Sequence, residues 1–134
     1  MASIREAKED DEATVVQLWQ LCGLAVSYND PVQDFHQALR GPSSTILVAD
    51  EGATGAIMVG HDGHRGWLYY VAAHPDERGK GLGRQLVEAA QAWLRERGVA
   101  KCQLLIRENN VGVAAFYESL GYEVTPRTVM AKWL

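Results

Sequence analysis

A strand, a glycine-rich turn, a helix and a second strand follow one another between positions 67 and 106, and this unit constrains the fold more than any other part of the chain. The apolar stretch Trp67–Ala73 is typical of a strand, and so is Lys101–Ile106. Between them, apolar residues from Leu82 to Leu94 recur with helical spacing until Gly98 ends the pattern. A strand, helix and strand in this order favour a right-handed parallel crossover, which places the turn at the carboxyl end of a central strand.

The remaining segments predict further strands and helices around this unit. Asp30 followed by Pro31 indicates a helix start, because the aspartate accepts from free amides while proline fits the first turn. The expected elements are strands at Ile4–Ala7, Thr45–Ala49, Gly55–Gly60, Tyr122–Val124 and Thr128–Trp133, and helices from about Asp10 to Gly23, Pro31 to Arg40 and Asn110 to Leu120. This order predicts one α+β domain over residues 1–134 with an α/β-like centre. We expect a mixed, largely antiparallel sheet of about seven strands, with a central parallel β-α-β pair and helices on both faces.

Composition limits the classes of partner. The chain has 134 residues, 47% of them hydrophobic and 22% charged, which is ordinary for a soluble domain. Its first residues are charged where a secretory signal would be apolar, so a cytoplasmic location is expected, with no membrane association. The net charge of -4 argues against a nucleic-acid-binding surface and suits a cationic small molecule or peptide amine.

The turn RGKGLGR, from Arg78 to Arg84, combines bare backbone with positive charge at a helix start. Unpaired amides and the helix dipole favour phosphate at such a position, and glycines let it approach. The dinucleotide fingerprint requires glycine where Arg84 stands, and a nucleoside-triphosphate loop requires serine or threonine where Gly81 follows Lys80. Both motifs are therefore excluded, and a diphosphate loop of another kind remains, with a glycine-rich turn that binds no ligand as the alternative.

The remaining pattern, Arg-x-x-Gly-x-Gly from Arg78 to Gly83, resembles the acyl-coenzyme A loop of the GNAT superfamily of N-acyltransferases. The stretch NNVGVAAFYESLGY, from Asn109 to Tyr122, is similar to a second signature of that family, an asparagine followed by a helix that bears Phe-Tyr and ends in Leu-Gly-aromatic. The order of elements also agrees, so the resemblance covers nearly the whole chain. The motifs YNDP, DGHRG and YY are most similar to those of the small YpeA-type acetyltransferases.

The resemblance implies acetyl-coenzyme A as acyl donor, held without a metal. In this family the two strands of the central unit splay apart, and the pantetheine chain pairs with the exposed edge of the first, while the diphosphate lies on the glycine loop. The implied coenzyme-binding residues are Val71, Ala72, Ala73, Arg78, Gly79, Lys80, Gly81, Leu82, Gly83, Arg84, Asn110, Phe116 and Tyr117.

The resemblance also implies catalytic roles. Tyr117 matches the family's tyrosine that protonates or hydrogen-bonds the coenzyme sulfur, although its place on an apolar helix stripe equally suits core packing. The backbone amide of Ala72 is the candidate for polarising the thioester oxygen. Many family members carry a glutamate in the strand that corresponds to Trp67–Ala73, and this chain has none there. Glu108 is the candidate base, with Tyr69 or Tyr70 as an alternative relay through water.

The implied acceptor is a primary amine on a small molecule, a peptide N-terminus or a lysine, acetylated in a ternary complex. Its pocket is expected at Tyr28, Asn29, Asp30 and Tyr69, where an aromatic ring beside an acid suits an ammonium group, although Asp30 equally serves as a helix cap. A noncatalytic acyl-coenzyme A sensor on the same fold and an interaction module without a coenzyme site are the alternatives. The protein is expected to be a monomer or a homodimer.

Overall fold

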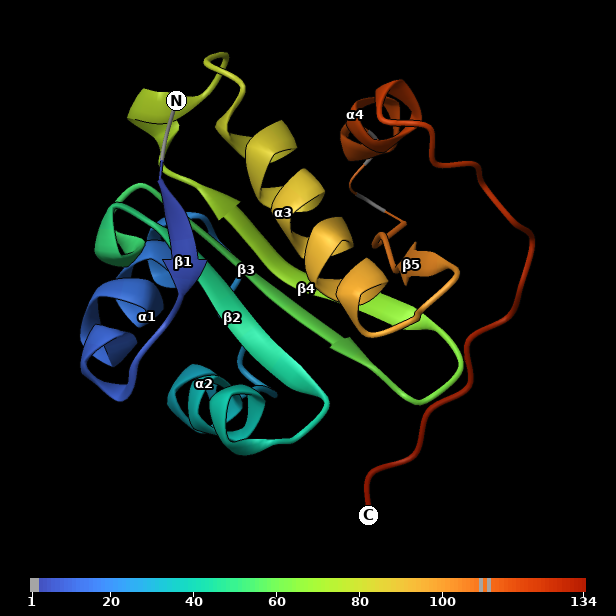
Figure 1. Ribbon diagram of the computed structural model, residues 1–134, viewed down its shortest axis with the longest axis horizontal. Coiled ribbons are helices and arrows are strands. Elements are labelled where there is room, and N and C mark those ends of the chain that lie inside the picture. Colours follow the sequence, from blue (N-terminus) through green and yellow to red (C-terminus); the bar gives the residue numbers. More distant parts are fainter. Residues whose placement is uncertain (1–2, 109, 111) are drawn as a thin grey trace.

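The sheet follows the order of the chain in the computed structural model, which describes residues 3–108, 110 and 112–134 (Figure 1). Its strands are β1 (Ile4–Glu6), β2 (Ser44–Ala49), β3 (Gly55–His61), β4 (Gly66–Ala73) and β5 (Cys102–Leu104). Its helices are α1 (Glu12–Leu21), α2 (Pro31–Arg40), α3 (Leu82–Glu96) and α4 (Val113–Ser119). Strands β1 to β4 pair antiparallel and β4 pairs with β5 in parallel, so the predicted mixed, largely antiparallel sheet is confirmed.

Local chemistry explains where the helices begin and end. The Asp30 side chain accepts a hydrogen bond from the Gln33 amide at 3.1 Å, and Pro31 occupies the first turn of α2, as the sequence predicts. Helix α3 ends at Glu96, and Gly98 adopts a φ of +76° just beyond it, a conformation that glycine takes without strain. No helix among the described residues is long and apolar enough to cross a lipid bilayer.

Helices cover both faces of the sheet, as predicted. Successive residues of β2 point to opposite faces, so Ile46 and Val48 lie in one core cluster while Leu47 and Ala49 lie in the other. The first cluster joins the sheet to α1 and α2, and the second joins it to α3 and Tyr117 of α4. Because both faces are buried, β2 is almost continuously apolar instead of alternating.

The prediction of seven strands is wrong at the C-terminus. The structure forms no strand in residues 121–134, which run past β5 and α4 along the outside of the molecule (Figure 1). Val124, Val129, Met130 and Trp133 are exposed there, with Trp133 77% accessible. Strand composition alone does not form a strand without a paired neighbour, and these residues have none in the described part of the chain.

Candidate active site

The two parallel strands of the sheet separate soon after they meet. Their pairing begins with Gly66 opposite Cys102 and ends with Leu68 opposite Leu104, whereas β4 continues to Ala73. β5 is therefore shorter than the predicted strand, and beyond Leu68 the β5-facing edge of β4 pairs with no described strand. Such an edge offers backbone donors and acceptors to an extended, amide-containing ligand.

A bulge in β4 lies at the point of separation. Between the pairs Met58–Tyr69 and Ala56–Ala72, β4 has two residues where β3 has one. The first of these, Tyr70, has a φ of +52°. A left-handed backbone at a residue other than glycine costs about 1 to 3 kcal/mol and persists only where surrounding contacts hold it. A bulge of this kind bends its strand and redirects a side chain.

The contacts that hold Tyr70 come from the helices on the α1 and α2 face. Its ring stacks on Trp19 with 4.0 Å between centroids, and its hydroxyl donates to the Asp34 carboxylate at 2.7 Å. Burial, followed by the hydrogen bond to Asp34, raises the pKa of the Tyr70 phenol, while a hydrogen bond from Asn29 opposes the shift. The phenol therefore stays protonated at neutral pH and donates to a fixed carboxylate.

The glycine loop between β4 and α3 exposes the start of that helix. Gly79 and Gly81 have φ values of +80° and +83°, which side-chain-bearing residues rarely adopt. Gly81 caps α3 without a side chain, and the amide of Gln85 is the first to donate back within the helix, to the Gly81 carbonyl at 3.1 Å. The amides that precede Gln85 in the first turn have no partner within the helix, and amides in such a position favour an anion.

A cavity of about 750 Å³ joins the end of β4, the glycine loop and α4. We call it the loop cavity. It brings together most of the residues that the family resemblance assigns to coenzyme A, namely Val71, Ala72, Ala73, Arg78, Gly79, Gly81, Leu82, Gly83, Arg84, Phe116 and Tyr117. Lys80 is not among its lining residues, and its ammonium lies 3.7 Å from the Glu77 carboxylate. Asn110 lines a neighbouring cavity instead.

That neighbouring cavity, of about 840 Å³, lies between α2, β4 and the segment after β5. We call it the α2 cavity. Asn29 and Tyr69, two of the expected acceptor residues, line it. Tyr28 does not: it is 61% exposed, and its ring meets Trp133 edge-on. Asp30 is not among the lining residues either, and its side chain caps α2.

Tyr117 lies where the two cavities meet, because it lines both of them. Its side chain is only 7% exposed. Burial, with a smaller effect from Cys102, raises the pKa of Tyr117 to about 12. The phenol is therefore protonated at neutral pH and can donate a proton or a hydrogen bond into the junction.

Sequence reasoning missed two residues of the α2 cavity. Asp34 and Arg107 line it, and neither belongs to a motif. Asp34 follows the cap of α2 by one turn, where an acid is ordinarily solvated, so the sequence carries no signal of its role. Glu108, the expected base, is exposed and lines neither cavity. Asn109 and Val111 of the second signature lie outside the described residues.

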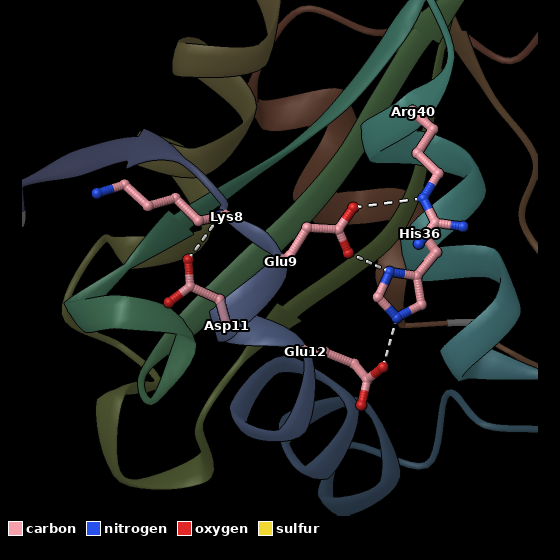
Figure 2. Close-up of polar contacts among 6 residues, drawn as sticks. All are labelled: Lys8, Glu9, Asp11, Glu12, His36 and Arg40. Carbon is pink, nitrogen blue, oxygen red and sulfur yellow. Dashed lines mark hydrogen bonds and ion pairs between the residues drawn. The ribbon is translucent and has the colours of Figure 1, made fainter.

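A charged cluster braces α2 against the start of α1 (Figure 2). The His36 ring of α2 lies between two carboxylates: Nδ1 pairs with Glu9, and Nε2 lies 2.5 Å from Oε1 of Glu12. Arg40 adds an exposed contact to Glu9 at 3.4 Å. The cluster thus fixes α2, which carries Asp34, relative to the body of the protein.

Replacing His36 with alanine should lower the free energy of unfolding by about 1 to 2 kcal/mol, because the Nε2 hydrogen bond to Glu12 and the Nδ1 contact with Glu9 are both lost from a side chain that is only 22% exposed. Urea unfolding at neutral pH measures this change. Arg40→Ala is the matched control from the same cluster and should change stability by close to zero, since its side chain is 70% exposed. Equal losses in the two variants would show that His36 does not brace α2.

Comparison with known proteins agrees with this geometry. The family model described as Acetyltransferase (GNAT) family matches residues 12–122. A Yersinia pestis (strain Pestoides F) protein named Acetyltransferase is 38% identical over 133 residues, covering 98% of this chain and 94% of its own length. A Pectobacterium atrosepticum protein named Acetyltransferase ECA0875 has the same identity and coverage. The chain therefore belongs to the GNAT family of acetyltransferases, and the resemblance drawn from its motifs is confirmed.

Solved structures support the same fold. A putative acetyltransferase from Agrobacterium tumefaciens strain C58 superposes with a TM-score of 0.81 at 22% identity, covering 98% of this chain and 99% of that chain. AAC(6')-Iy, solved with the bisubstrate analogue CoA-S-monomethyl-acetylneamine, superposes with a TM-score of 0.83 at 19% identity. The match covers 100% of this chain and 99% of that chain. At these identities the likeness concerns the fold, and the acceptors of these proteins are their own.

Proposed function

We propose that this protein transfers an acetyl group from acetyl-coenzyme A to a primary amine, by direct attack within a ternary complex. The observation that carries the proposal is the meeting of two cavities at Tyr117, one beside the start of α3 and the other beside Asp34. A donor and an acceptor bound in the two cavities would have their reacting ends at this buried phenol.

The residues of the loop cavity fit a coenzyme that carries a diphosphate. The amides of the first turn of α3 and the guanidinium groups of Arg78 and Arg84 would hold the diphosphate. A Cβ atom at Gly83 would lie 3.2 Å from the Phe116 ring, so this part of the cavity wall has no room for a side chain at position 83. The unpaired edge of β4 from Val71 to Ala73 would pair with the pantetheine amides.

Acetyl-coenzyme A supplies a thioester whose acyl carbon accepts a nucleophile. The reaction forms a bond from the amine nitrogen to that carbon and breaks the carbon–sulfur bond, so the amine gives up a proton and the sulfur takes one. Tyr117 would hold the proton for the sulfur at its phenol oxygen. The backbone amide of Ala72 would polarise the acyl oxygen. Glu108 could accept the amine proton only through water, because it lines neither cavity.

One observation favours the alternative of a noncatalytic acyl-coenzyme A sensor. No residue of β4, from Gly66 to Ala73, has a carboxylate, so the strand lacks the base that many family members carry there. A sensor would bind the coenzyme in the loop cavity and leave the α2 cavity without a reacting amine.

Thiol release from acetyl-coenzyme A, followed with and without added amines, tests the proposal. We expect release that depends on both protein and amine, with an N-acetylated product identified by mass spectrometry. Calorimetric titration with acetyl-coenzyme A runs in parallel. Tight binding without turnover across amines, amino acids, peptides and aminoglycosides would favour the sensor, and no binding at all would favour an interaction module without a coenzyme site.

A further inference from the structure

The α2 cavity contains one charge of each sign. Among its described lining residues, Asp34 is the one acid and Arg107 is the one base. The other polar groups around it are neutral, chiefly Asn29, Tyr69 and Tyr70. A ligand that fills this cavity therefore meets one negative and one positive charge, carried by side chains from different parts of the chain.

The negative charge is held in place. Asp34 projects from a ten-residue helix, and one carboxylate oxygen, Oδ2, accepts the Tyr70 hydrogen bond at 2.7 Å. Stacking of Tyr70 on Trp19 fixes the donor in turn. The other carboxylate oxygen, Oδ1, makes no hydrogen bond or ion pair with a described side chain. It is available to a cationic group of a ligand, and its partner oxygen keeps it oriented.

The positive charge comes from a different element. Arg107 follows β5, and its guanidinium forms no ion pair within the described part of the chain. Its charge nevertheless reaches the same region, because it lowers the pKa of the Tyr70 phenol against the larger effects of burial and Asp34. A guanidinium at a cavity wall presents a planar fork of donors that matches a carboxylate.

We propose that the acceptor is a small zwitterion of the amino acid class, whose primary ammonium binds Asp34 while its carboxylate binds Arg107. This inference rests on the proposed function, because it names the acceptor for the same site. Asp34 and Arg107 would hold the two ends of the acceptor within the cavity that Tyr117 also lines. A polycation such as an aminoglycoside lacks the carboxylate and meets an unpaired guanidinium, so the site disfavours it by like-charge repulsion.

Matched pairs of acceptors test the charge requirement. Glycine and methylamine, L-alanine and ethylamine, L-phenylalanine and phenethylamine, and L-lysine and cadaverine each differ by one carboxylate, and kanamycin represents the polycations. Initial rates of thiol release at saturating acetyl-coenzyme A give kcat/KM for each acceptor. We expect the best amino acid to exceed its decarboxylated partner at least about tenfold, mainly through KM, as one charge-assisted contact supplies.

Variants of the cavity identify the residues responsible. Arg107→Gln should lower the ratio of kcat/KM between the amino acid and its decarboxylated partner at least about tenfold, whereas Asp34→Asn should lower kcat/KM for both members of the pair. Arg95→Gln, on the exposed surface of α3 outside both cavities, is the matched control and should change neither. Thermal unfolding of each variant checks that the fold is intact.

A binding measurement separates this inference from the proposed function. Calorimetric titration of the same pairs into the protein loaded with coenzyme A detects the zwitterion preference even if no amine is acetylated, in which case the proposed function fails while the binding of a zwitterion by Asp34 and Arg107 stands. If the decarboxylated amines or kanamycin match the amino acids in kcat/KM or in affinity, the inference is overturned, while acetyl transfer itself remains in place. Absence of binding by every acceptor, or a preference that Arg107→Gln leaves unchanged, also overturns it.

Discussion

Gly83→Val should raise the dissociation constant for acetyl-coenzyme A at least about 100-fold, which corresponds to about 2.7 kcal/mol. Gly83 lies in the first turn of α3 and lines the loop cavity. A Cβ atom there would lie 3.2 Å from Cζ of Phe116, tighter than ordinary van der Waals contact, and valine adds two methyl groups beyond it. Either the Phe116 ring moves or the added methyl groups cover the amides that the diphosphate requires. Calorimetric titration measures the loss.

Two further variants isolate the cause of that loss. Gly83→Ala should weaken binding less than valine, because only one carbon enters the contact with Phe116. Ala92→Val adds a β-branched residue to the exposed side of the same helix, away from both cavities, and should leave the affinity unchanged. If Gly83→Val unfolds at the wild-type temperature and still binds acetyl-coenzyme A normally, the loop cavity is not the donor site.

Features that depend on neighbouring residues could be predicted from the sequence. The start of α2 follows from Asp30 and Pro31, whose cap and fixed φ act within one turn. The open start of α3 follows from the spacing of Gly79, Gly81 and the cations around them. The parallel pairing of β4 and β5 follows from the helix between them.

Features that depend on residues far apart in the chain could not be predicted from the sequence. The α2 cavity takes its charges from Asp34 and Arg107, which only folding brings to one cavity. The bulge at Tyr70 has no glycine to signal its positive φ, because stacking on Trp19 and the bond to Asp34 hold it instead. The expected C-terminal strands failed for a related reason, since pairing depends on a partner strand that composition does not reveal.

Tyr117→Phe should lower kcat at least about 100-fold while changing the dissociation constant for acetyl-coenzyme A less than about threefold. Tyr117 lines both cavities, and its pKa of about 12 keeps a proton on the phenol at neutral pH. Phenylalanine keeps the ring and its contacts with Phe116 and Tyr122 but removes that proton. The Tyr117 hydroxyl makes no hydrogen bond to a described residue, so the fold should lose little stability. Single-turnover kinetics with a saturating amine measure the chemical step.

The neighbouring tyrosine is the matched control. Tyr122 donates to the Cys102 sulfur and accepts from Gln91 at 2.8 Å, and it lines neither cavity. Tyr122→Phe should therefore cost about 1 kcal/mol of stability and leave kcat nearly unchanged.

The pH dependence of the wild-type rate gives a second test of Tyr117. A phenol with a pKa of about 12 stays protonated below about pH 10, so Tyr117 should cause no fall in rate as the pH rises to that value. Equal kcat in Tyr117→Phe and the wild type would remove the acid role and leave Tyr117 as a packing residue between the cavities.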